Sequence, residues 1–210
     1  MLSPSENIEG RPGVGRVEAF SDGVVAIIVT IMVLELHPPV AAGLEKLWAL
    51  WPVFFAYALS YIYVALYWSN HHRLFGHARI VTNQLVWSNM ALLFTLSLVP
   101  FATAYLGEHH FSRDATLVYL GVLLLPCVTY AWLQRVVRAT GEHSARAEAY
   151  HVATLRKGVF AIFLNVIGFP LTFVSPWIGI ACAMLVAIFW FLPNSPLDRF
   201  FAGKAGQTAS

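Results

Sequence analysis

Charged side chains are scarce in this sequence. Asp, Glu, Lys and Arg make up 11% of its 210 residues, whereas 58% are hydrophobic. A soluble domain carries roughly 25% charged residues, so we predict an all-α integral membrane protein. The formal net charge of +2 is too small to suggest a nucleic-acid partner.

Ionisable groups are also missing from the centres of the apolar segments after the first one. Proton-coupled carriers and aspartyl intramembrane proteases need such groups, so both classes are disfavoured. The histidines lie at segment ends or in loops, which argues against a haem held inside the bundle. His109 and His110 are adjacent and point in different directions on a helix. We therefore expect no metal site, no cofactor and no enzyme.

Cysteine is rare as well. Cys127 and Cys182 both lie inside apolar runs, and we interpret them as small buried residues without a disulfide. Residues 1–15 lack the basic start and apolar core of a cleavable signal peptide. They are predicted to form a cytoplasmic tail, residues 16–193 the transmembrane domain, and residues 194–210 a polar cytoplasmic tail.

Long apolar runs are what the sequence does have. They predict six membrane-spanning helices. Pro100 is expected to kink the third, and the polar segment 134–157 between the fourth and fifth is expected to be a helical hairpin that serves as a solvated linker. The predicted spans are Val17–Leu36, Leu47–Trp68, Leu85–Leu106, Ala115–Leu133, Val159–Val174 and Trp177–Leu192.

The distribution of basic residues predicts the topology. If the N-terminus is cytoplasmic, the inner segments hold eleven Lys or Arg residues and the outer loops only Lys46 and Arg113. The positive-inside rule therefore places both termini in the cytoplasm. That arrangement requires an even number of spans, which agrees with six.

The first span carries an aliphatic stripe. At about 100° per residue, Ile27 and Leu34 lie about 20° apart on the helix, with Thr30 and Ile31 on either side of the same line. Phe20 and Gly23 extend the stripe toward the cytoplasm. The pattern alone fits a lipid-facing surface, core packing or a pore, and a single Thr in a span usually bonds its own backbone.

Asp22 lies about 140° away from Ile27 on the same wheel, so we expect it to face neighbouring helices. A charged Asp at this depth is costly without a partner. The candidate partners are polar residues at the cytoplasmic ends of other spans or of its own: Arg16, His71, His72 and Asn89.

At these residues the sequence resembles a known family. The pattern R-x3-F-S-D-G-V-x-A-I-x-x-T, which runs from Arg16 to Thr30, is similar to the first-helix signature of the bacterial transmembrane protein 175 family, prokaryotic relatives of the endosomal and lysosomal potassium channel. The segment YWSNHHRLF that ends span two, and N-x4-F-x-L-S-L-x-P-F from Asn89 to Phe101, also look like that family. The second half resembles it only in its number of spans.

The resemblance implies a homotetramer of six-helix subunits in the bacterial inner membrane, with the first helices lining a pore. No TVGYG-like filter is present. The resemblance instead assigns the constriction to Ile27, with Ile31 and Leu34 as further aliphatic contributors, and a selectivity layer to Thr30. It also assigns a structural, helix-locking network to the signature, whose predicted members are Arg16, Phe20, Ser21, Asp22, His71, His72 and Asn89.

An aliphatic constriction predicts a modest ion preference. It offers no ligands, so potassium would be favoured over sodium mainly because potassium gives up its water more easily. Thr30 hydroxyls could replace part of the hydration shell. Glu35, at the outer mouth, could concentrate cations, or it could be a surface acid paired with Lys46 or with solvent.

Two alternatives to a potassium-preferring channel stay open. The first is a small-solute carrier, which the breaks at Pro100 and at Gly168-Phe169-Pro170 permit. The second is a membrane scaffold subunit without transport of its own.

Overall fold

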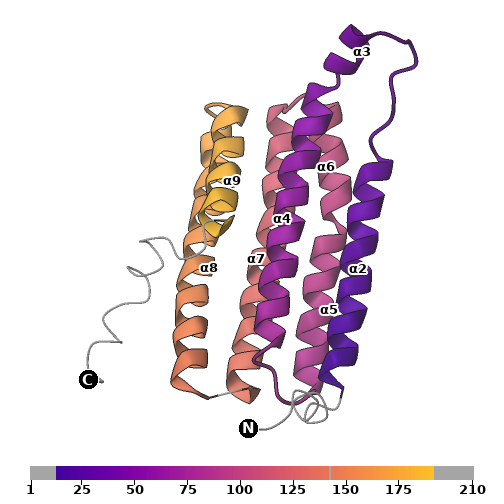
Figure 1. Ribbon diagram of the computed structural model, residues 1–210. Helices are drawn as coiled ribbons and strands as arrows, with labels where there is room; N and C mark the ends of the chain where they lie inside the picture. The colour runs from indigo at the N-terminus through magenta and orange to yellow at the C-terminus, as the bar shows by residue number, and fades with distance from the viewer. Residues whose placement is uncertain (1–12, 142, 192–210) are drawn as a thin grey trace.

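The computed structural model describes residues 13–141 and 143–191. The predicted tails lie almost wholly outside these residues. Within them every regular element is a helix, and the long helices run side by side (Figure 1). The elements are α2 (Val14–Leu34), α3 (Leu44–Trp48), α4 (Trp51–Phe75), α5 (Asn83–Ser97), α6 (Val99–Glu108), α7 (Arg113–Thr140), α8 (Ala145–Thr172) and α9 (Pro176–Phe191).

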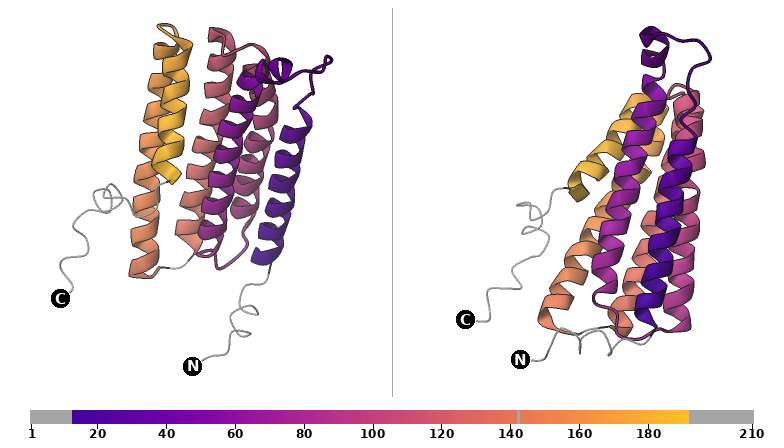
Figure 2. Two further views of the ribbon diagram at one scale, coloured as in Figure 1. Left: turned by 45° about the horizontal axis from the view of Figure 1, so that its top comes forward. Right: turned by 45° about the vertical axis from the view of Figure 1, so that its right-hand side comes forward.

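Helices α4 and α7 form the middle of the bundle. Helix α2 lies at one edge and the α8–α9 pair at the opposite edge (Figures 1 and 2). One core cluster joins α2, α4, α5 and α7 around Met32, Leu74 and Leu92. A second joins α4, α6, α7 and α9 around Tyr119, Leu120 and Ile180. Helix α2 therefore packs on the bundle through one side only.

Five stretches are long and apolar enough to cross a membrane, counting α5 and α6 as one. Helix α9 is apolar and comprises 16 of the described residues, fewer than the other spans. The predicted multi-pass helical architecture is therefore confirmed for the described residues. The sixth span stays a prediction.

Two predicted boundaries of the second span are wrong. The chain forms a separate short helix, α3, over Leu44–Trp48, and α4 starts only at Trp51. Helix α4 then continues past Trp68 to Phe75, because His71, Leu74 and Phe75 are buried against the bundle and stabilise these last turns. The polar YWSNHHR segment is therefore helical, and three of its side chains, Trp68, His71 and His72, bond residues of α2 or α5.

The predicted third span is interrupted where Pro100 requires it. Helix α5 ends at Ser97 and α6 begins at Val99. Proline has no N–H to donate to the carbonyl four residues earlier, but it is well accommodated in the first turn of a new helix. Pro100 occupies that first turn in α6.

The helical hairpin predicted for residues 134–157 is present. Helix α7 extends to Thr140 and α8 starts at Ala145. An Arg138–Glu148 ion pair joins the two helices beside the turn, and the Gln134 side chain donates to the His151 carbonyl (2.9 Å). The fourth and fifth helices are therefore longer than the predicted spans, and little of the segment is a linker.

Gly107 allows α6 to approach α4 closely. A Cβ built at this position would lie 2.8 Å from the Val53 Cα. We expect Gly107→Ala to lower the free energy of unfolding by about 1–3 kcal/mol through overpacking, measured as a lower thermal midpoint in detergent. Gly158→Ala is the matched control, because a Cβ at Gly158 meets nothing within 4 Å. A Gly107→Ala midpoint equal to that of the control would contradict the assigned packing.

An uncovered aliphatic face and the polar contacts of α2

One face of α2 packs against the bundle. Its buried residues are Val14, Ser21, Ile28 and Met32, spaced seven, seven and four apart, which keeps them on one side of a helix. Val24, Val25 and Val29 flank them and are partly buried. This alignment leaves the other side of α2 without cover from the described residues of its own chain.

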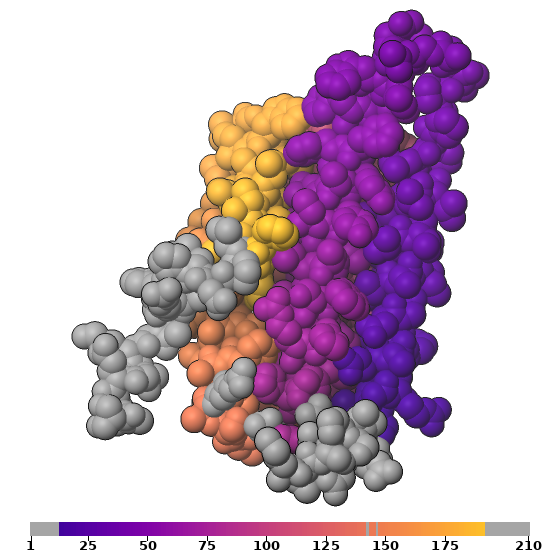
Figure 3. Space-filling view, viewed as in Figure 1, coloured from indigo at the N-terminus to yellow at the C-terminus, as the bar shows by residue number. Residues whose placement is uncertain are grey.

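The predicted stripe lies on that uncovered side. Ile27 is 58% exposed, Ile31 42% and Leu34 73%, and Thr30 is exposed between them. In the space-filling view α2 forms a margin of the molecule (Figure 3). The described chain therefore presents an aliphatic ridge, with one hydroxyl, to lipid or to other molecules.

The Thr30 hydroxyl bonds its own helix, as the sequence indicated. Its Oγ1 donates to the Ile27 carbonyl (2.8 Å). Because the proton is directed at the backbone, the oxygen lone pairs are available on the exposed side. Those lone pairs can accept a hydrogen bond from water or contact a cation.

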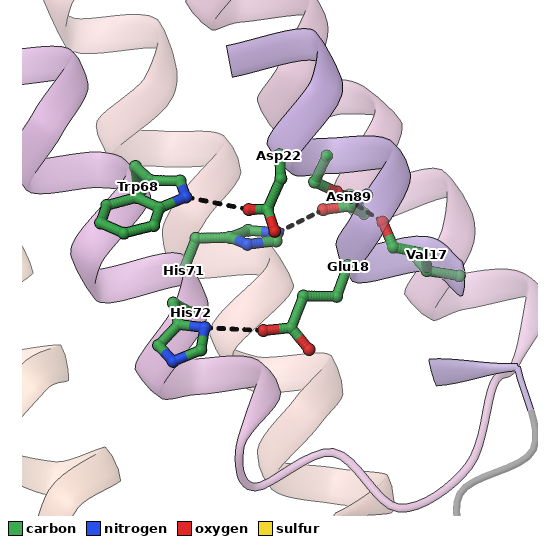
Figure 4. Close-up of polar contacts among 8 residues, drawn as sticks. Val17, Glu18, Asp22, Trp68, His71, His72 and Asn89 are labelled. Carbon is green, nitrogen blue, oxygen red and sulfur yellow. Dashed lines mark hydrogen bonds and ion pairs between the residues drawn. The ribbon is translucent and has the colours of Figure 1, made fainter. Parts of the chain in front are cut away.

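Asp22 faces α4, and its partner is not one of the four predicted. The Trp68 Nε1 donates to Asp22 Oδ1 (2.9 Å; Figure 4). The prediction that Asp22 points away from the stripe is confirmed, but its partner was wrong. Trp68 was interpreted as an interface aromatic, and its indole N–H is a donor that a half-buried carboxylate can use.

A buried hydrogen-bond chain links α2, α5 and α4. Asn89 Nδ2 donates to Ser21 Oγ (2.9 Å), and Ser21 Oγ donates to the Val17 carbonyl (2.8 Å). Asn89 Oδ1 accepts from His71 Nε2 (2.8 Å; Figure 4). Asn89 is fully buried, Ser21 1% exposed and His71 4% exposed. These three predicted residues are therefore brought together.

An ion pair adds a further contact at the same end of the helices. His72 Nδ1 lies 2.8 Å from Glu18 Oε1 (Figure 4). Both side chains are partly open to solvent, at 65% and 25% exposure. Exposed pairs of this kind stabilise a protein by at most about 1 kcal/mol, so this contact contributes little to the free energy of folding.

Arg16 and Phe20 do not join these contacts. Both are exposed, Phe20 by 54%, and they lie four residues apart on the same side of α2 as Ile27. In the described part of the chain, no hydrogen bond or ion pair connects Arg16 to Asp22, His71 or Asn89. These two signature residues therefore lie outside the network among the described residues, and Glu18 and Trp68, which were not predicted, belong to it.

The spacing of polar residues offered a signal for the missed members. Glu18, Ser21 and Asp22 occupy positions i, i+3 and i+4 of α2, which is one helix face. Trp68, His71 and His72 show the same spacing on α4. The two helices run antiparallel, so Glu18 meets His72 at one end and Asp22 meets Trp68 at the other, with Asn89 bridging the middle.

Glu35 lies at the other end of α2. It is the C-terminal cap residue and is exposed. Its carboxylate forms no ion pair with Lys46 among the described residues.

Known proteins share both the sequence and the fold. A sequence profile described as the endosomal/lysosomal potassium channel TMEM175 matches residues 16–100. A potassium channel of Chryseobacterium sp. (strain P1-3) is 41% identical over 186 residues, covering 88% of this chain and 96% of the relative. The crystal structure of a lysosomal potassium-selective channel TMEM175 homolog from Chamaesiphon minutus matches with a TM-score of 0.75 at 30% identity, covering 85% of this chain and 96% of that chain.

A more distant relative is the endosomal/lysosomal proton channel TMEM175 of Homo sapiens. It is 40% identical over 95 residues, which are 40% of this chain and 18% of the human one. The bacterial relatives instead match nearly from end to end, so the likeness extends well beyond the signature into the second half of the chain. With 41% identity over almost the whole of one relative and the same fold in a solved one, the chain belongs to the TMEM175 family.

Proposed function

We propose that this chain forms a potassium-preferring cation channel, in which four copies place their α2 helices around one axis. The observation that carries the proposal is the uncovered stripe on α2, where Ile27 is 58% and Leu34 73% exposed. A helix at the edge of its own bundle, bearing an aliphatic face with one threonine, becomes a pore wall when other copies supply the remaining sides. The names of the bacterial relatives, which are potassium channels, support potassium as the permeant ion.

In this arrangement four Ile27 side chains form the narrowest ring, with Ile31 and Leu34 forming further apolar layers. An apolar constriction excludes water unless it widens, so small movements of α2 can gate it. The ring supplies no ligands for a bare ion. Selectivity then follows from the energy of dehydration, which is lower for potassium than for sodium, so sodium should pass more slowly rather than be excluded.

Polar groups on either side of the ring would assist permeation. Thr30 lies next to Ile27 and Ile31 and has an oxygen available after donating to its own helix. Four such oxygens can replace part of the hydration shell of an ion. Glu35 would form an acidic ring at the outer mouth and raise the local cation concentration.

The network around Asn89 would set the angle of α2. It joins α2 to α4 and α5 through directed hydrogen bonds at the end that the loop charges predict to be cytoplasmic. We place the protein in the bacterial inner membrane with both termini in the cytoplasm. The network has no part in binding the ion.

The proposal is tested by ion flux and crosslinking on the purified protein in liposomes. We expect potassium flux above that of empty liposomes, with a smaller sodium flux. Ile27→Cys and Leu34→Cys should each give covalent dimers with a short bismaleimide, because the side chains converge on the axis and one thiol per copy joins to one other copy. The double variant, with two thiols per copy, should give a ladder up to tetramer. Ile188→Cys is the control, since Ile188 is similarly exposed (52%) but lies on α9 at the far edge.

Two results would overturn this assignment. Flux equal to that of empty liposomes would favour a non-transporting scaffold subunit. Potassium flux without crosslinking at either α2 position would show that ions pass elsewhere, as expected for a carrier with a site inside each subunit.

A further inference from the structure

Two segments that are far apart in the sequence meet at the predicted cytoplasmic end of the bundle. One is the loop of residues 76–82, which joins α4 to α5, and the other is the hairpin formed by the ends of α7 and α8 (Figure 1). The loop contacts the end of α7 closely, because a Cβ built on Gly141 would lie 2.5 Å from the His77 carbonyl oxygen. Ala78, the next residue of the loop, is only 2% exposed. The start of the loop is therefore packed onto the α7–α8 hairpin.

Two histidine side chains lie at this contact. The centre of the His77 ring, in the loop, lies 5.6 Å from that of the His151 ring on α8. The Tyr150 ring lies beside both, 4.8 Å from His77 and 5.5 Å from His151. Tyrosine is uncharged near neutral pH, so Tyr150 supplies no charge to the contact. We call His77 and His151 the histidine pair.

The histidine pair lacks the hydrogen bonds that buried imidazoles normally make. His151 is 1% exposed, and among the described residues neither of its ring nitrogens has a hydrogen-bond partner. Nδ1 of His77 is buried without a described partner as well. The hydrogen bond from the Gln134 side chain to His151 uses the backbone carbonyl and leaves the ring unsatisfied. Buried polar atoms are nearly always paired, so three unpaired ring nitrogens at one contact require an explanation.

The surrounding charges do not compensate a proton on His151. The described groups that act on it electrostatically are His77 from the loop, Arg138 from α7, His143 from the turn and Glu148 from α8. Glu148 is the one acid among these four, and its carboxylate is already bonded to Arg138. The other three groups are basic, so they disfavour a further positive charge beside them.

Protonation should therefore separate the histidine pair. A neutral imidazole can stay buried, whereas an imidazolium carries two N–H donors and a charge, and its burial without an acceptor or a counter-ion is far more costly. Water can satisfy the charged rings only if the loop and the hairpin move apart. The separated arrangement binds protons at the ordinary histidine pKa of about 6.5, and the packed arrangement binds fewer. The packed arrangement is therefore the stable one above that pH, and a falling pH favours separation.

The loop is connected to the residues that hold α2. It begins directly after α4, whose last turns carry Trp68, His71 and His72, and it ends at α5, which carries Asn89. All four side chains take part in the hydrogen bonds and the ion pair that fix α2. A displacement of the loop therefore reaches the helix ends that orient α2.

We propose that the histidine pair is a pH-sensitive switch, in which acidification of the cytoplasm releases the α4–α5 loop from the α7–α8 hairpin. Neutral histidines keep the loop packed near pH 7. Histidine clusters that become charged at about pH 5–6 separate packed surfaces in the same way. The switch acts on the position of helices, so it does not depend on which ion the protein conducts.

The test is hydrogen–deuterium exchange of the detergent-purified full chain, about one pH unit above and one below the ordinary histidine pKa of about 6.5. Exchange times are scaled to the intrinsic amide rate at each pH. We expect protection of residues 76–80 and of the first turns of α8 to fall by about tenfold at the lower pH, which is the proton uptake of one histidine over that range. Protection of residues 72–76, at the end of α4, should fall with it. Helix α6, in the other half of the bundle (Figure 1), should keep its protection.

His151→Leu distinguishes the switch from a general effect of acid. Leucine has a similar volume and cannot be charged, so protection of the loop should differ by less than about twofold between the two pH values. His143→Leu is the matched control, because His143 is an exposed histidine in the same turn, and it should retain the tenfold loss. Size-exclusion elution and the thermal midpoint at the higher pH show whether each variant is folded. If His151→Leu does not fold, His151→Gln, which is also uncharged at both pH values, takes its place.

Four results would overturn the proposal. The first is equal protection of the loop at the two pH values in the natural chain, because the histidine pair would then stay packed when charged. The second is a full tenfold loss in folded His151→Leu or His151→Gln. The third is the absence of that loss in His143→Leu, which would make His143 the titrating group. The fourth is a loss of protection that extends to α6, as expected for acid unfolding of the whole bundle.

Discussion

Replacing Ile27 with asparagine should change ion flux more than any other single substitution in this chain. The Ile27 side chain is 58% exposed on the stripe and is its first large aliphatic residue after Phe20. An amide at each of four positions would wet the constriction and offer oxygen ligands to sodium as well as potassium. We expect conductance to rise and the potassium preference to fall, each by about tenfold, which corresponds to about 1.4 kcal/mol.

The measurement is flux into liposomes in potassium and in sodium at equal protein density. Ile188→Asn is the matched control, because it makes the same change at a similarly exposed isoleucine on α9. If Ile27→Asn altered neither conductance nor ion preference, the pore would not be lined by this face of α2. If Ile188→Asn changed conductance and ion preference as much as Ile27→Asn, the changes would come from any polar residue in a span and not from the pore.

Asn89→Ala should cause the largest loss of stability. Asn89 is fully buried and bonds both Ser21 and His71. Its loss leaves the buried His71 Nε2 without an acceptor, which costs about 1–3 kcal/mol, removes the hydrogen bond that Ser21 Oγ accepts, and leaves a small void. We expect a loss of about 3 kcal/mol, seen as a thermal midpoint several degrees lower in detergent.

The control is Asn83→Ala, which makes the same change at an exposed asparagine on the same helix, α5. Its midpoint should stay within about 0.5 kcal/mol of the natural protein, as surface substitutions do. Equal midpoints for the two variants would show that the contacts of Asn89 contribute little. A second readout is potassium flux, which should change in Asn89→Ala because α2 loses its hydrogen bond to α5 and keeps only those of Asp22 and Glu18 to α4.

The helical architecture could be predicted from the sequence because apolar length and loop charge depend on residues close together in the chain. That Ile27, Ile31 and Leu34 share one side of α2 could be predicted too, since a helix wheel needs only the 3.6-residue period. The wheel did not show whether that side would be covered by other helices. The interruption at Leu98 followed from the missing N–H of Pro100.

The partners of the signature residues could not be predicted in this way. Trp68 lies 46 residues from Asp22, and whether an indole faces a membrane interface or a carboxylate is decided by packing. The sequence also predicted that the second span ends at Trp68, because the residues after it are polar. The helix continues because His71 and Phe75 are buried by α2, α5 and α7, which the local sequence does not show. The proposed assembly of four copies depends on contacts between chains, which local sequence patterns do not reveal.

The contacts of α2 are unevenly distributed along its length. Its hydrogen bonds and ion pair to other helices, within the described residues, involve Glu18, Ser21 and Asp22 at one end. Toward Leu34 it meets its neighbours through Ile28 and Met32, and dispersion contacts have no preferred direction. We therefore expect α2 to tilt, if it moves, around the end that holds Glu18, Ser21 and Asp22.

The distance of a residue from Asp22 would then set how far that residue moves when α2 tilts. At 1.5 Å per residue, Ile27 is about 8 Å and Leu34 about 18 Å beyond Asp22 along the axis. A tilt of about 5° around the pivot would displace Ile27 by roughly 0.7 Å and Leu34 by roughly 1.6 Å. In the proposed tetramer the Leu34 ring would therefore open wider than the Ile27 ring for the same tilt, so Ile27 would remain the narrowest point.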